Sequence, residues 1–469
     1  MSVPSAQSES TVKRDIYLMV AHHTDDRILL LPSEGGWELP HFDPGRPAII
    51  EVGPSNTWAS ETLGAEITVL RCVYFHVSED KKHIEAVLAA ENHSQEWVPP
   101  LGGRWFGLEE LVDIEFAVSE HRQLVETWLL EERGASPPQR SPWAHRGWFR
   151  ATEDWIREEA GKLGISPTGR LEQVKTWGIS CVLRQPTDAG VLYFKAVPTL
   201  FAQEPLITQH LSRRFPGHVP PPLAYRVAVG QSWMLLMDIG GIAARESTLT
   251  LRQWEDLLGL LGRIQRESVG DVDDLLRAGC ADRRLELLAS QVDELFLDGD
   301  AIGELAAAEV EKLRAYAPRL KAMCAELAAY GIPQTLVHGD FGRGNVNLKG
   351  EDYVIFDWTD ACITHPFFDL STLFEWDVPE DMKVQVRDSY LHGWREYAPG
   401  DVIAQADKLA RPLGALHHAV SYRNIVANLE PTAKWEMLGG STPWLRSLLE
   451  WIEAESAQAD GQGGLVGSR

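Results

Sequence analysis

Two carboxylates and one carboxamide stand in two short polar loops, and each loop follows an apolar run. The first loop begins His338-Gly339-Asp340 and reaches Asn345, and the second carries Asp357. Oxygen ligands of this kind suit Mg²⁺, which prefers one or two protein carboxyl or amide oxygens together with phosphate oxygens and water. Phosphoryl transfer also needs a carboxylate that orients the attacking hydroxyl. The residue types therefore predict Asp340 as the base, with Asn345 and Asp357 as metal ligands.

The loops must be held by the elements before them. An isolated His-Gly-Asp is ordinarily just a turn, because Gly and Asp both favour turns. Here the two loops follow Thr335-Leu336-Val337 and Tyr353-Val354-Ile355-Phe356, which both read as short buried strands. A third piece, Asp369, comes soon after. Three ordered pieces within about thirty residues are much harder to obtain by chance than one, and we interpret them as parts of one site.

This arrangement resembles the aminoglycoside phosphotransferase and choline kinase family. The loop of that family reads His-Gly-Asp, four residues, Asn, and a hydrophobic strand ending in Asp-Trp or Asp-Phe follows. The resemblance implies that Asp340 is the catalytic base, that Asn345 and Asp357 hold magnesium, and that His338 and Asp369 brace the catalytic loop. It also implies a two-lobed, protein-kinase-like domain that binds ATP or GTP and Mg²⁺ between its lobes.

A single lysine lies in the strand-like run Val191-Leu192-Tyr193-Phe194-Lys195-Ala196. A lone strand lysine normally points to solvent. The resemblance implies instead that Lys195 contacts the nucleotide phosphates and pairs with Glu204, at the start of a helix expected over residues 201–211. The alternative is two unrelated surface charges.

The turn expected to cover the phosphates lies in residues 174–183, which contain only Gly178 and no GxGxxG pattern. Ser180 or the backbone amides around Gly178 remain able to cradle a phosphate. An apolar strand further along ends before Gly240. By resemblance, backbone groups near Met237 and Asp238 meet the adenine.

The acceptor is expected to be a small molecule with a hydroxyl group. Gly339 stands where protein kinases carry Arg, Trp358 replaces the Phe-Gly that follows their metal aspartate, and no Ala-Pro-Glu follows. Without the arginine, an activation-loop phosphate has no partner. Candidate acceptor residues are Asp360, Glu375 and Tyr422, each of which also reads as an ordinary surface or core residue.

Composition sets limits on the partners. The net charge of -24 argues against nucleic acids and anionic membranes. It suits a cationic substrate, although a generally acidic, solvated surface is the favoured explanation. No apolar run is long enough to span a membrane and the first residues do not resemble a signal peptide, which favours a cytoplasmic protein. Five scattered cysteines without a CxxC pair predict reduced thiols.

The N-terminal region has a second set of motifs. They are the strand-like runs at 15–20 and 27–31 around the turn at 23–26, then Trp37-Glu38-Leu39-Pro40, and later Arg104-Trp105-Phe106-Gly107-Leu108-Glu109-Glu110-Leu111. Their order resembles the Nudix fold. Nudix hydrolases hold metal through Arg-Glu-x-x-Glu-Glu on a helix, and the matching stretch at 57–64 retains only Glu61. One carboxylate cannot hold the metal cluster needed for pyrophosphate hydrolysis. We therefore expect a catalytically degenerate Nudix-like domain.

The expected fold class is α+β, with an α/β Nudix-like domain preceding the kinase-like domain. The expected segments are 1–12 (disordered), 13–133 (Nudix-like), 134–144 (Pro-rich linker), 145–240 (kinase N-lobe), 241–454 (kinase C-lobe with the acceptor site) and 455–469 (disordered tail).

Three functions stay open at this stage. The favoured one is ATP- and Mg-dependent phosphorylation of a hydroxyl on an aminoglycoside, amino sugar, sugar or amino alcohol. The alternatives are a nucleotide-binding pseudokinase or regulatory protein, and a bifunctional enzyme with pyrophosphohydrolase activity. The identity of the acceptor and the oligomeric state are not readable from the sequence.

Overall fold

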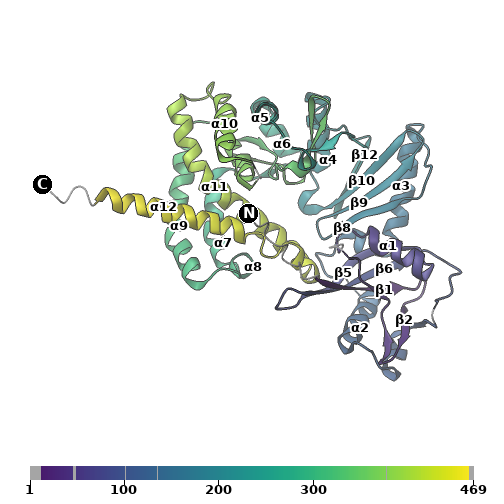
Figure 1. Cartoon of the computed structure of the whole chain (residues 1–469). Helices are drawn as coiled ribbons and strands as arrows, with labels where there is room; N and C mark the ends of the chain where they lie inside the picture. Colours follow the sequence, from purple (N-terminus) through teal and green to yellow (C-terminus); the bar gives the residue numbers. More distant parts are fainter. Residues whose placement is uncertain (1–11, 46–48, 101, 135, 376–377, 464–469) are drawn as a thin grey trace, which may run out of the picture. The chain divides into compact units, whose positions relative to one another are not determined.

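The computed structural model describes residues 12–45, 49–100, 102–134, 136–375 and 378–463, with the side chains of 373–375 and 458–463 left aside. The chain forms two compact units. The first is made of Met1–Pro198 and Leu429–Glu436, and the second of Thr199–Asn428 and Met437–Arg469. Each unit combines helices with strands, so the α+β class predicted from the sequence is confirmed (Figure 1).

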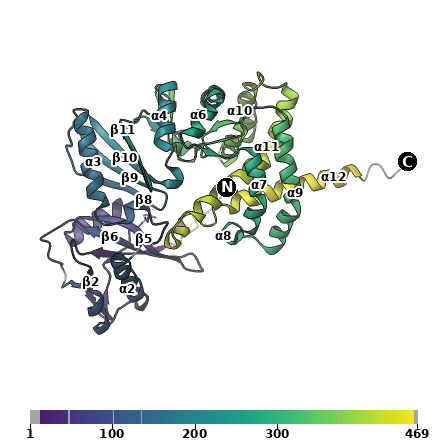
Figure 2. The same ribbon diagram turned by 180° about the vertical axis from the view of Figure 1, so that it is seen from behind.

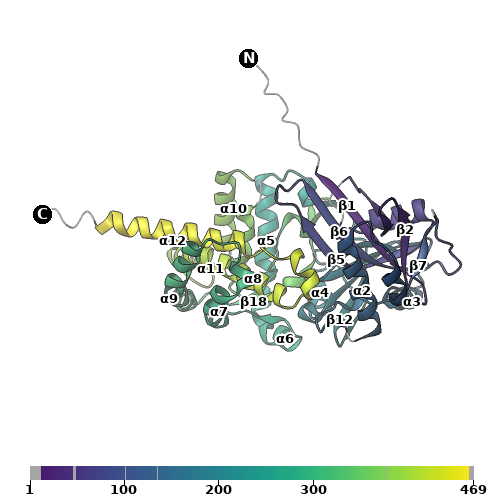
Figure 3. The same ribbon diagram turned by 90° about the horizontal axis from the view of Figure 1, so that it is seen from below.

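A sheet of seven strands forms the N-terminal part of the first unit. Its strands are β1 (Lys13–Ala21), β2 (Ile28–Ser33), β3 (Gly36–Glu38), β4 (His41–Phe42), β5 (Ile67–Val77), β6 (His83–Asn92) and β7 (Arg104–Phe106). The main order is β3-β2-β1-β6-β5, with β4 paired to β1 and β7 paired to β2. β1 runs parallel to β6, and these two strands lie beside β5 in Figure 3. β1 and β2 are antiparallel, which confirms the strand pair predicted around the turn at 23–26.

Apolar clusters lie on both faces of this sheet, because successive side chains of a strand point to opposite faces. Leu18 of β1 packs in one cluster with Leu63, and its neighbour Met19 packs in the other with Trp128. The helices that contribute to these clusters are α1 (Gly53–Trp58), the π-helix η1 (Ala59–Leu63), the 3-10 helix η2 (Leu108–Asp113) and α2 (Ser119–Arg133).

The rest of the first unit is an antiparallel meander packed against a helix. Its elements are η3 (Pro142–Ala144), α3 (Trp148–Lys162), β8 (Glu172–Trp177), β9 (Ser180–Thr187) and β10 (Gly190–Pro198). Trp148 of α3 meets Phe194 of β10 with ring centroids 6.0 Å apart. Gln173 of β8 joins the meander to the N-terminal sheet, since its side chain accepts from the N–H of Val69 at 3.0 Å and donates to the Val69 carbonyl at 2.7 Å.

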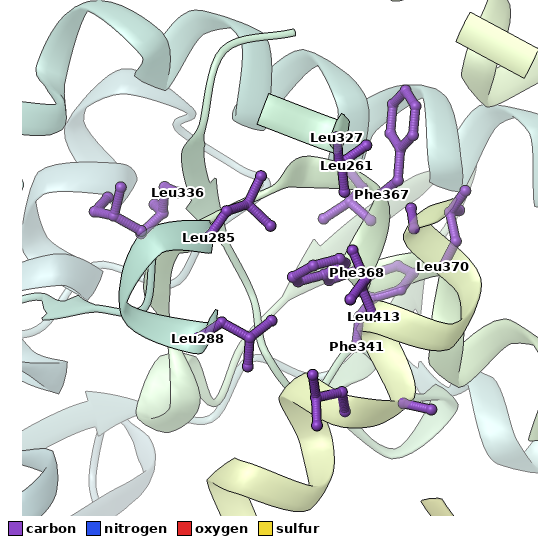
Figure 4. Packing of buried hydrophobic residues seen from close by; sticks show 14 of the residues in the cluster. Leu261, Leu285, Leu288, Leu327, Leu336, Phe341, Phe367, Phe368, Leu370 and Leu413 are labelled. Atoms are coloured by element: carbon purple, nitrogen blue, oxygen red, sulfur yellow. The ribbon is translucent and has the colours of Figure 1, made fainter. Parts of the chain in front are cut away.

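The second unit is mainly helical. Its α-helices are α4 (Glu204–Arg214), α5 (Leu251–Glu267), α6 (Val272–Arg277), α7 (Leu285–Leu297), α8 (Gly299–Ile302), α9 (Ala307–Ala329), α10 (Glu380–His392), α11 (Gly400–Ala427) and α12 (Thr442–Gly463). Helices α7, α9 and α11 lie together (Figure 2), and Leu288, Leu320 and Leu416 bring them into one apolar core. Figure 4 shows Phe341 and Phe368 in the same core, so buried rings anchor the first polar loop itself and the chain after the second.

Small sheets and single turns carry the polar loops of this unit. The strands are β11 (Ala224–Ala228), β12 (Gln231–Met237), β13 (Ile242–Ala243), β14 (Ala281–Asp282), β15 (Thr335–Val337), β16 (Val346–Lys349), β17 (Asp352–Ile355) and β18 (Cys362–Thr364). The 3-10 helices are η4 (Thr199–Phe201), η5 (Ala244–Glu246), η6 (Ser268–Asp271), η7 (Arg343–Asn345), η8 (Trp358–Asp360) and η9 (Pro366–Glu375), while η10 (Pro431–Glu436) belongs to the first unit. β15 is antiparallel to β18 with Val337 opposite Cys362. The loop that leaves β15 therefore lies beside the chain that enters β18.

The boundaries differ from those expected. The division between compact units falls after Pro198, and neither the segment 134–144 nor position 240 separates them. The hydrogen bonds of Gln173 explain this, because they join the N-terminal sheet to β8 across that segment. The helix expected from residue 201 begins at Glu204, and Pro205 occupies its first turn, where a missing N–H costs no helical hydrogen bond.

The C-terminal expectation is corrected in part. The composition predicts an irregular tail over 455–469, yet α12 continues to Gly463. Ala, Glu and Gln are good helix formers, which explains the continuation. Residues 1–11 and 464–469 lie outside the described part of the chain. All five cysteines are buried and free, as predicted. Among the described residues, no helix is both long and apolar enough to cross a membrane.

Candidate active site

His338 fixes the start of the catalytic loop from a fully buried position after β15. Its Nδ1 accepts a hydrogen bond from the backbone N–H of Asp340 at 3.3 Å. In the neutral ring the proton is therefore on Nε2, which donates to the carbonyl of Phe356 at 3.0 Å. The imidazole thus joins the loop that carries Asp340 to the residue just before Asp357.

Asp369 holds the same loop from the other side. Its carboxylate accepts the backbone N–H of His338 at 2.8 Å through Oδ2 and that of Gly339 at 2.9 Å through Oδ1. Gln265 of α5 donates to Oδ2 at 2.9 Å. Burial raises the pKa of Asp369 to about 6, and these N–H donors act in the opposite direction. The contacts expected of His338 and Asp369 as a brace are therefore present.

Asn345 ends the single turn η7, and its side chain contacts Asp340. Its Nδ2 donates to the carbonyl of Asp340 at 2.8 Å and to the Asp340 carboxylate Oδ2 at 3.0 Å. Because the nitrogen is used in both contacts, the carboxamide oxygen is the atom of Asn345 left to meet a cation. The candidate base and the first candidate metal ligand are thus in direct contact.

Asp357 stands at the end of β17 in an uncommon backbone conformation. Its φ of 62° and ψ of 60° lie in the left-handed region, which Asp tolerates better than most residues. Its Oδ1 accepts a hydrogen bond from the hydroxyl of Thr359. The β16–β17 hairpin brings it toward Asn345, because the N–H of Phe356 donates to the Asn345 carbonyl at 3.0 Å.

The donor set fits magnesium. One carboxylate on Asp357 and one carboxamide on Asn345 are hard oxygen ligands, and Mg²⁺ on nucleotide phosphates takes few protein ligands beside phosphate and water. In the described part of the chain, no three His, Cys, Asp or Glu side chains gather closely enough to form a metal site by themselves.

Gly339 allows the loop to pack directly on the segment after Asp357. Its φ is +80°, and a Cβ at this position would lie only 2.3 Å from the carbonyl oxygen of Asp360. Every side chain is therefore excluded at 339, both by conformation and by space. This close approach brings Asp360, a candidate acceptor residue, next to the catalytic loop.

The carboxyl group of Asp340 is tuned by its surroundings. It retains an exposed face, but the protein packed around it raises its pKa to about 7, and the negative charges of Asp360 and Asp357 act in the same direction. The hydrogen bond from Asn345 opposes this change. A carboxylate with a pKa near neutrality can accept a proton from a hydroxyl group more readily than an ordinary Asp.

The candidate adenine-binding segment follows β12. Met237 is partly exposed and Asp238 is exposed, and Oδ1 of Asp238 accepts the N–H of Gly240 at 2.9 Å. Asn347 of β16 donates to the Gly240 carbonyl at 2.8 Å. These bonds join the segment to the strand that follows Asn345, so the second unit brings it close to the metal loop.

The remaining residues predicted to bind the nucleotide do not all lie in the same unit. Lys195 lies on β10 of the first unit, opposite Val182, whereas Glu204 starts α4 of the second unit and is nearly fully buried. Their ion pair stays a prediction. Ser180 is buried, and its hydroxyl accepts a hydrogen bond from Trp177 Nε1 at 2.6 Å. The Ser180 hydroxyl keeps its own proton to donate, and its contact with a phosphate stays a prediction.

Two acceptor candidates lie on helical elements of the second unit. Glu375 ends η9, and its side chain lies outside the described part of the chain. Tyr422 lies on α11, with its ring against Gly440. Their role in binding an acceptor stays a prediction.

Sequence reasoning missed two side chains that hold the site. Gln265 reaches Asp369 from α5, far away in the sequence, and no local pattern marks it. Thr372 donates to the carbonyl of Phe341 at 2.5 Å and to that of Asp369 at 3.0 Å. Its position shortly after Asp369 is the signal that was available.

Comparison with known proteins identifies one family. Residues 173–406 match the model of the phosphotransferase enzyme family. No curated protein matches the chain. Among solved structures, similarity is found to the aminoglycoside phosphotransferase APH(3'')-Id from Streptomyces rimosus ATCC10970, with 20% identity, a TM-score of 0.40, and coverage of 57% of this chain and 98% of that chain.

Two further solved structures show similar values. A putative fructosamine-3-kinase from Thermobifida fusca YX-ER1 has 17% identity and a TM-score of 0.42. Macrolide 2'-phosphotransferase MphH from Brachybacterium faecium has 16% identity and a TM-score of 0.42. Each comparison covers 62% of this chain and 97% of the other.

The family match covers the residues that carry the chemistry. Asp340, Asn345 and Asp357 all fall inside residues 173–406, as do Lys195 and Asp369, while the N-terminal sheet lies outside the match. The similarity to the phosphotransferase enzyme family therefore extends over residues 173–406, just under half of the chain.

Proposed function

We propose that the protein transfers the terminal phosphoryl group of ATP or GTP, with Mg²⁺, to a hydroxyl group of an aminoglycoside, amino sugar, sugar or amino alcohol. The observation that carries the proposal is the contact at 3.0 Å between Asn345 Nδ2 and Asp340 Oδ2, beside the αL residue Asp357. A base and two oxygen ligands within one pair of loops are the parts that phosphoryl transfer requires.

Asp340 is the proposed base. It would orient the acceptor hydroxyl and receive its proton as the new oxygen–phosphorus bond forms. Asn345 and Asp357 would hold Mg²⁺, which supplies positive charge to the phosphates when bound. Lys195 would contact the phosphates, and the backbone at Met237 and Asp238 would meet the base of the nucleotide.

The acceptor is proposed to carry positive charge near its reacting hydroxyl. Asp360 lies against the catalytic loop through its contact with Gly339, and its carboxylate raises the pKa of Asp340, so both groups face a common region. An ammonium group would offset this concentration of negative charge. Glu375 and Tyr422 are further candidates for the acceptor site.

Residues 13–133 are proposed to be a degenerate Nudix-like domain without its own reaction. Glu61, the one carboxylate retained from the expected metal helix, is exposed on the π-helix η1. A single exposed carboxylate does not hold the metal ions that pyrophosphate hydrolysis needs. Purified residues 1–469 should therefore leave nucleoside diphosphate derivatives intact.

The test is a mass-spectrometric screen of aminoglycosides, amino sugars, sugars and choline-like alcohols with Mg-ATP. The wild type is compared with Asp340→Asn and with the control Asp352→Asn, which changes an exposed carboxylate in the same hairpin region. Loss of turnover by a factor of at least about 100 is expected for Asp340→Asn alone. Nucleotide binding without modification of any acceptor would favour a regulatory protein.

A further inference from the structure

The turn that joins β8 to β9 is bound by two other segments of the first unit. We call residues 177–180 the Gly178 turn. The N–H of Gly178 donates to Glu436 Oε2 at 2.6 Å, and its carbonyl accepts from Ser141 Oγ at 2.9 Å. Trp143 Nε1 donates to the carbonyl of the preceding residue at 2.8 Å. Contacts on both sides leave this turn little freedom to move.

Glycine at position 178 is required by space. A Cβ there would lie 2.4 Å from Leu429 Cδ2 and 3.0 Å from Glu436 Oε2. Both residues belong to Leu429–Glu436, the segment that leaves the second unit after α11 and joins the first. We call this segment the clamp. The single glycine of the turn is therefore explained by close approach of the clamp.

The clamp is fixed to the N-terminal sheet by an aromatic contact. The indole of Trp435 stacks on Phe75 of β5, with ring centroids 3.9 Å apart and an interplanar angle of 23°. Stacked aromatic pairs contribute attraction beyond the apolar area they bury. β5 thereby supports the end of the clamp that carries Glu436.

A chain of buried ion pairs fixes the other end of the clamp. Arg140 donates through Nε to Glu430 Oε2 at 3.0 Å and through Nη2 to Glu131 Oε2 at 2.9 Å. Arg71 of β5 also donates to Glu131 Oε2, at 2.6 Å. The side chains of Arg140 and Glu430 are only 3% and 5% exposed. Loss of one member would leave a buried charge without compensation, so the four side chains hold the clamp as a group.

We propose that Glu436 is a positioning residue for nucleotide binding, which holds the Gly178 turn ready to meet a nucleotide phosphate. The N-terminal sheet is then the scaffold that supports the clamp. This inference rests on the proposed function, because it takes the nucleotide to be the phosphoryl donor. The sequence lacks the glycine-rich pattern that lets a flexible loop fold around phosphates. A turn fixed in advance avoids the entropy that a mobile loop loses when it binds.

The hydrogen bonding of the turn is consistent with this role. Glu436 occupies the N–H of Gly178, whereas the next N–H, that of Ile179, takes part in no hydrogen bond within the described part of the chain. A single backbone N–H of a fixed turn can donate a hydrogen bond to an anion. Burial raises the pKa of Glu436 to about 7, so near neutral pH its carboxyl carries less than a full negative charge toward a phosphate.

The experiment compares binding of two probes to the full-length chain by calorimetry. One probe is the Mg complex of a non-hydrolysable ATP analogue, and the other is adenosine, which has no phosphates. The variants are Glu436→Ala, which removes the acceptor, and Glu436→Asp, which keeps the charge but shortens the reach. Glu436→Gln keeps an acceptor oxygen, and Glu450→Ala changes an exposed carboxylate of α12 as a control.

We expect Glu436→Ala and Glu436→Asp to weaken binding of the ATP analogue about tenfold, the value for loss of one hydrogen bond to a charged group. Adenosine should bind them as it binds the wild type. Glu436→Gln should restore most of the affinity, and Glu450→Ala should match the wild type. Hydrogen exchange in residues 173–183 should be faster in Glu436→Ala, which reports on the turn independently of any ligand.

Three results would overturn the inference. Unchanged binding of the ATP analogue by Glu436→Ala would show that the clamp has no positioning role. Tighter binding would show that the clamp prevents the turn from contacting the phosphate. Equal weakening for adenosine would indicate general damage to the fold. If the wild type itself binds no nucleotide, the proposed function fails. If the wild type binds the nucleotide and Glu436→Ala binds it equally well, only the role of Glu436 fails.

Discussion

The carboxamide of Asn345 donates to the carboxylate of Asp340 at 3.0 Å, so the candidate metal ligand also orients the candidate base. The same nitrogen holds the backbone carbonyl of Asp340 at 2.8 Å. Residues 340 to 345 therefore form a closed loop whose two ends depend on each other. A change at Asn345 is expected to alter the base as well as the metal.

Replacement of Asp357 by Asn should separate metal binding from folding. Asn adopts the left-handed conformation as readily as Asp, so the φ of 62° is retained and the melting temperature should change little. Loss of the negative charge should weaken the binding of Mg²⁺ together with the nucleotide by at least about tenfold, or about 1.4 kcal/mol. A titration with Mg²⁺ measures this. Asp352→Asn in the same hairpin is the control, and equal behaviour of the two variants would contradict the assignment of Asp357.

Gly339→Ala should lower the stability of the protein. The new Cβ would meet the carbonyl of Asp360, and alanine would have to adopt a φ of +80°. A cost of about 1–3 kcal/mol in the free energy of unfolding is expected for such strain. Thermal unfolding measures it against Gly259→Ala, which lies in α5 with open space around it and should be neutral or slightly stabilising. A normal melting temperature for Gly339→Ala would show that the loop has room to move.

Asp369→Asn should loosen the catalytic loop. Asn offers one oxygen where Asp369 uses two to accept the N–H groups of His338 and Gly339, and its NH₂ group would face a donor. The free energy of unfolding should fall by about 1–3 kcal/mol. A double-mutant cycle with Gln265→Ala should give a coupling energy of at least about 0.5 kcal/mol, because Gln265 donates to the same carboxylate. Additive effects would contradict the shared network.

Glu436 should give the stability a pH dependence of known sign. Burial raises its pKa from the ordinary value of 4.5 to about 7 in the folded protein. The folded state thus keeps a proton that the unfolded chain has already lost. The resulting stabilisation is complete below pH 4.5 and is lost as the pH rises to about 7. The groups that face Glu436 are the N–H of Gly178, Lys175 of β8, Glu430 of the clamp and Cys72 of β5, whose thiol pKa burial keeps well above its usual range.

Denaturant unfolding at several pH values tests this. The free energy of unfolding of the wild type, relative to Glu436→Gln, should decrease by on the order of 1 kcal/mol between about pH 5 and about pH 8. The comparison with Gln cancels the titration of other groups. A difference that stays constant over this range would mean that Glu436 titrates normally.

The parts of the site that were predictable are those with local signals. An apolar run followed by a polar turn marks β15 with His338 and Asp340, and the same pattern marks β17 with Asp357. Their proximity also followed from the sequence through the family resemblance. The family resemblance implied that Asp369 braces the catalytic loop, and its hydrogen bonds to the N–H groups of His338 and Gly339 are of the kind that this role requires.

Contacts between distant segments were not predictable. Nothing in the sequence relates Gln265 to Asp369, or Glu436 to Gly178, because each pair is joined only by the folded path of the chain. The same reason explains why the segment 134–144 does not separate the compact units. The Pro-rich segment was interpreted as a linker because the ion pairs of Arg140 with Glu131 and Glu430 cannot be recognised from the sequence. The sequence shows which residues can do chemistry more clearly than which residues hold them in place.

The path of the clamp decides how the chain can be divided. The first unit is not a continuous stretch of sequence, because Leu429–Glu436 belongs to it while the helices before and after belong to the second unit. A protein shortened to residues 1–198 would leave the Phe75 ring uncovered and Arg140 without Glu430. A fragment that starts at residue 199 would contain the clamp but would lack Phe75 and Arg140, the residues that the clamp contacts. No single cut in the backbone yields two self-sufficient pieces, so neither unit can be exchanged with a relative, or lost, without redesign of the other.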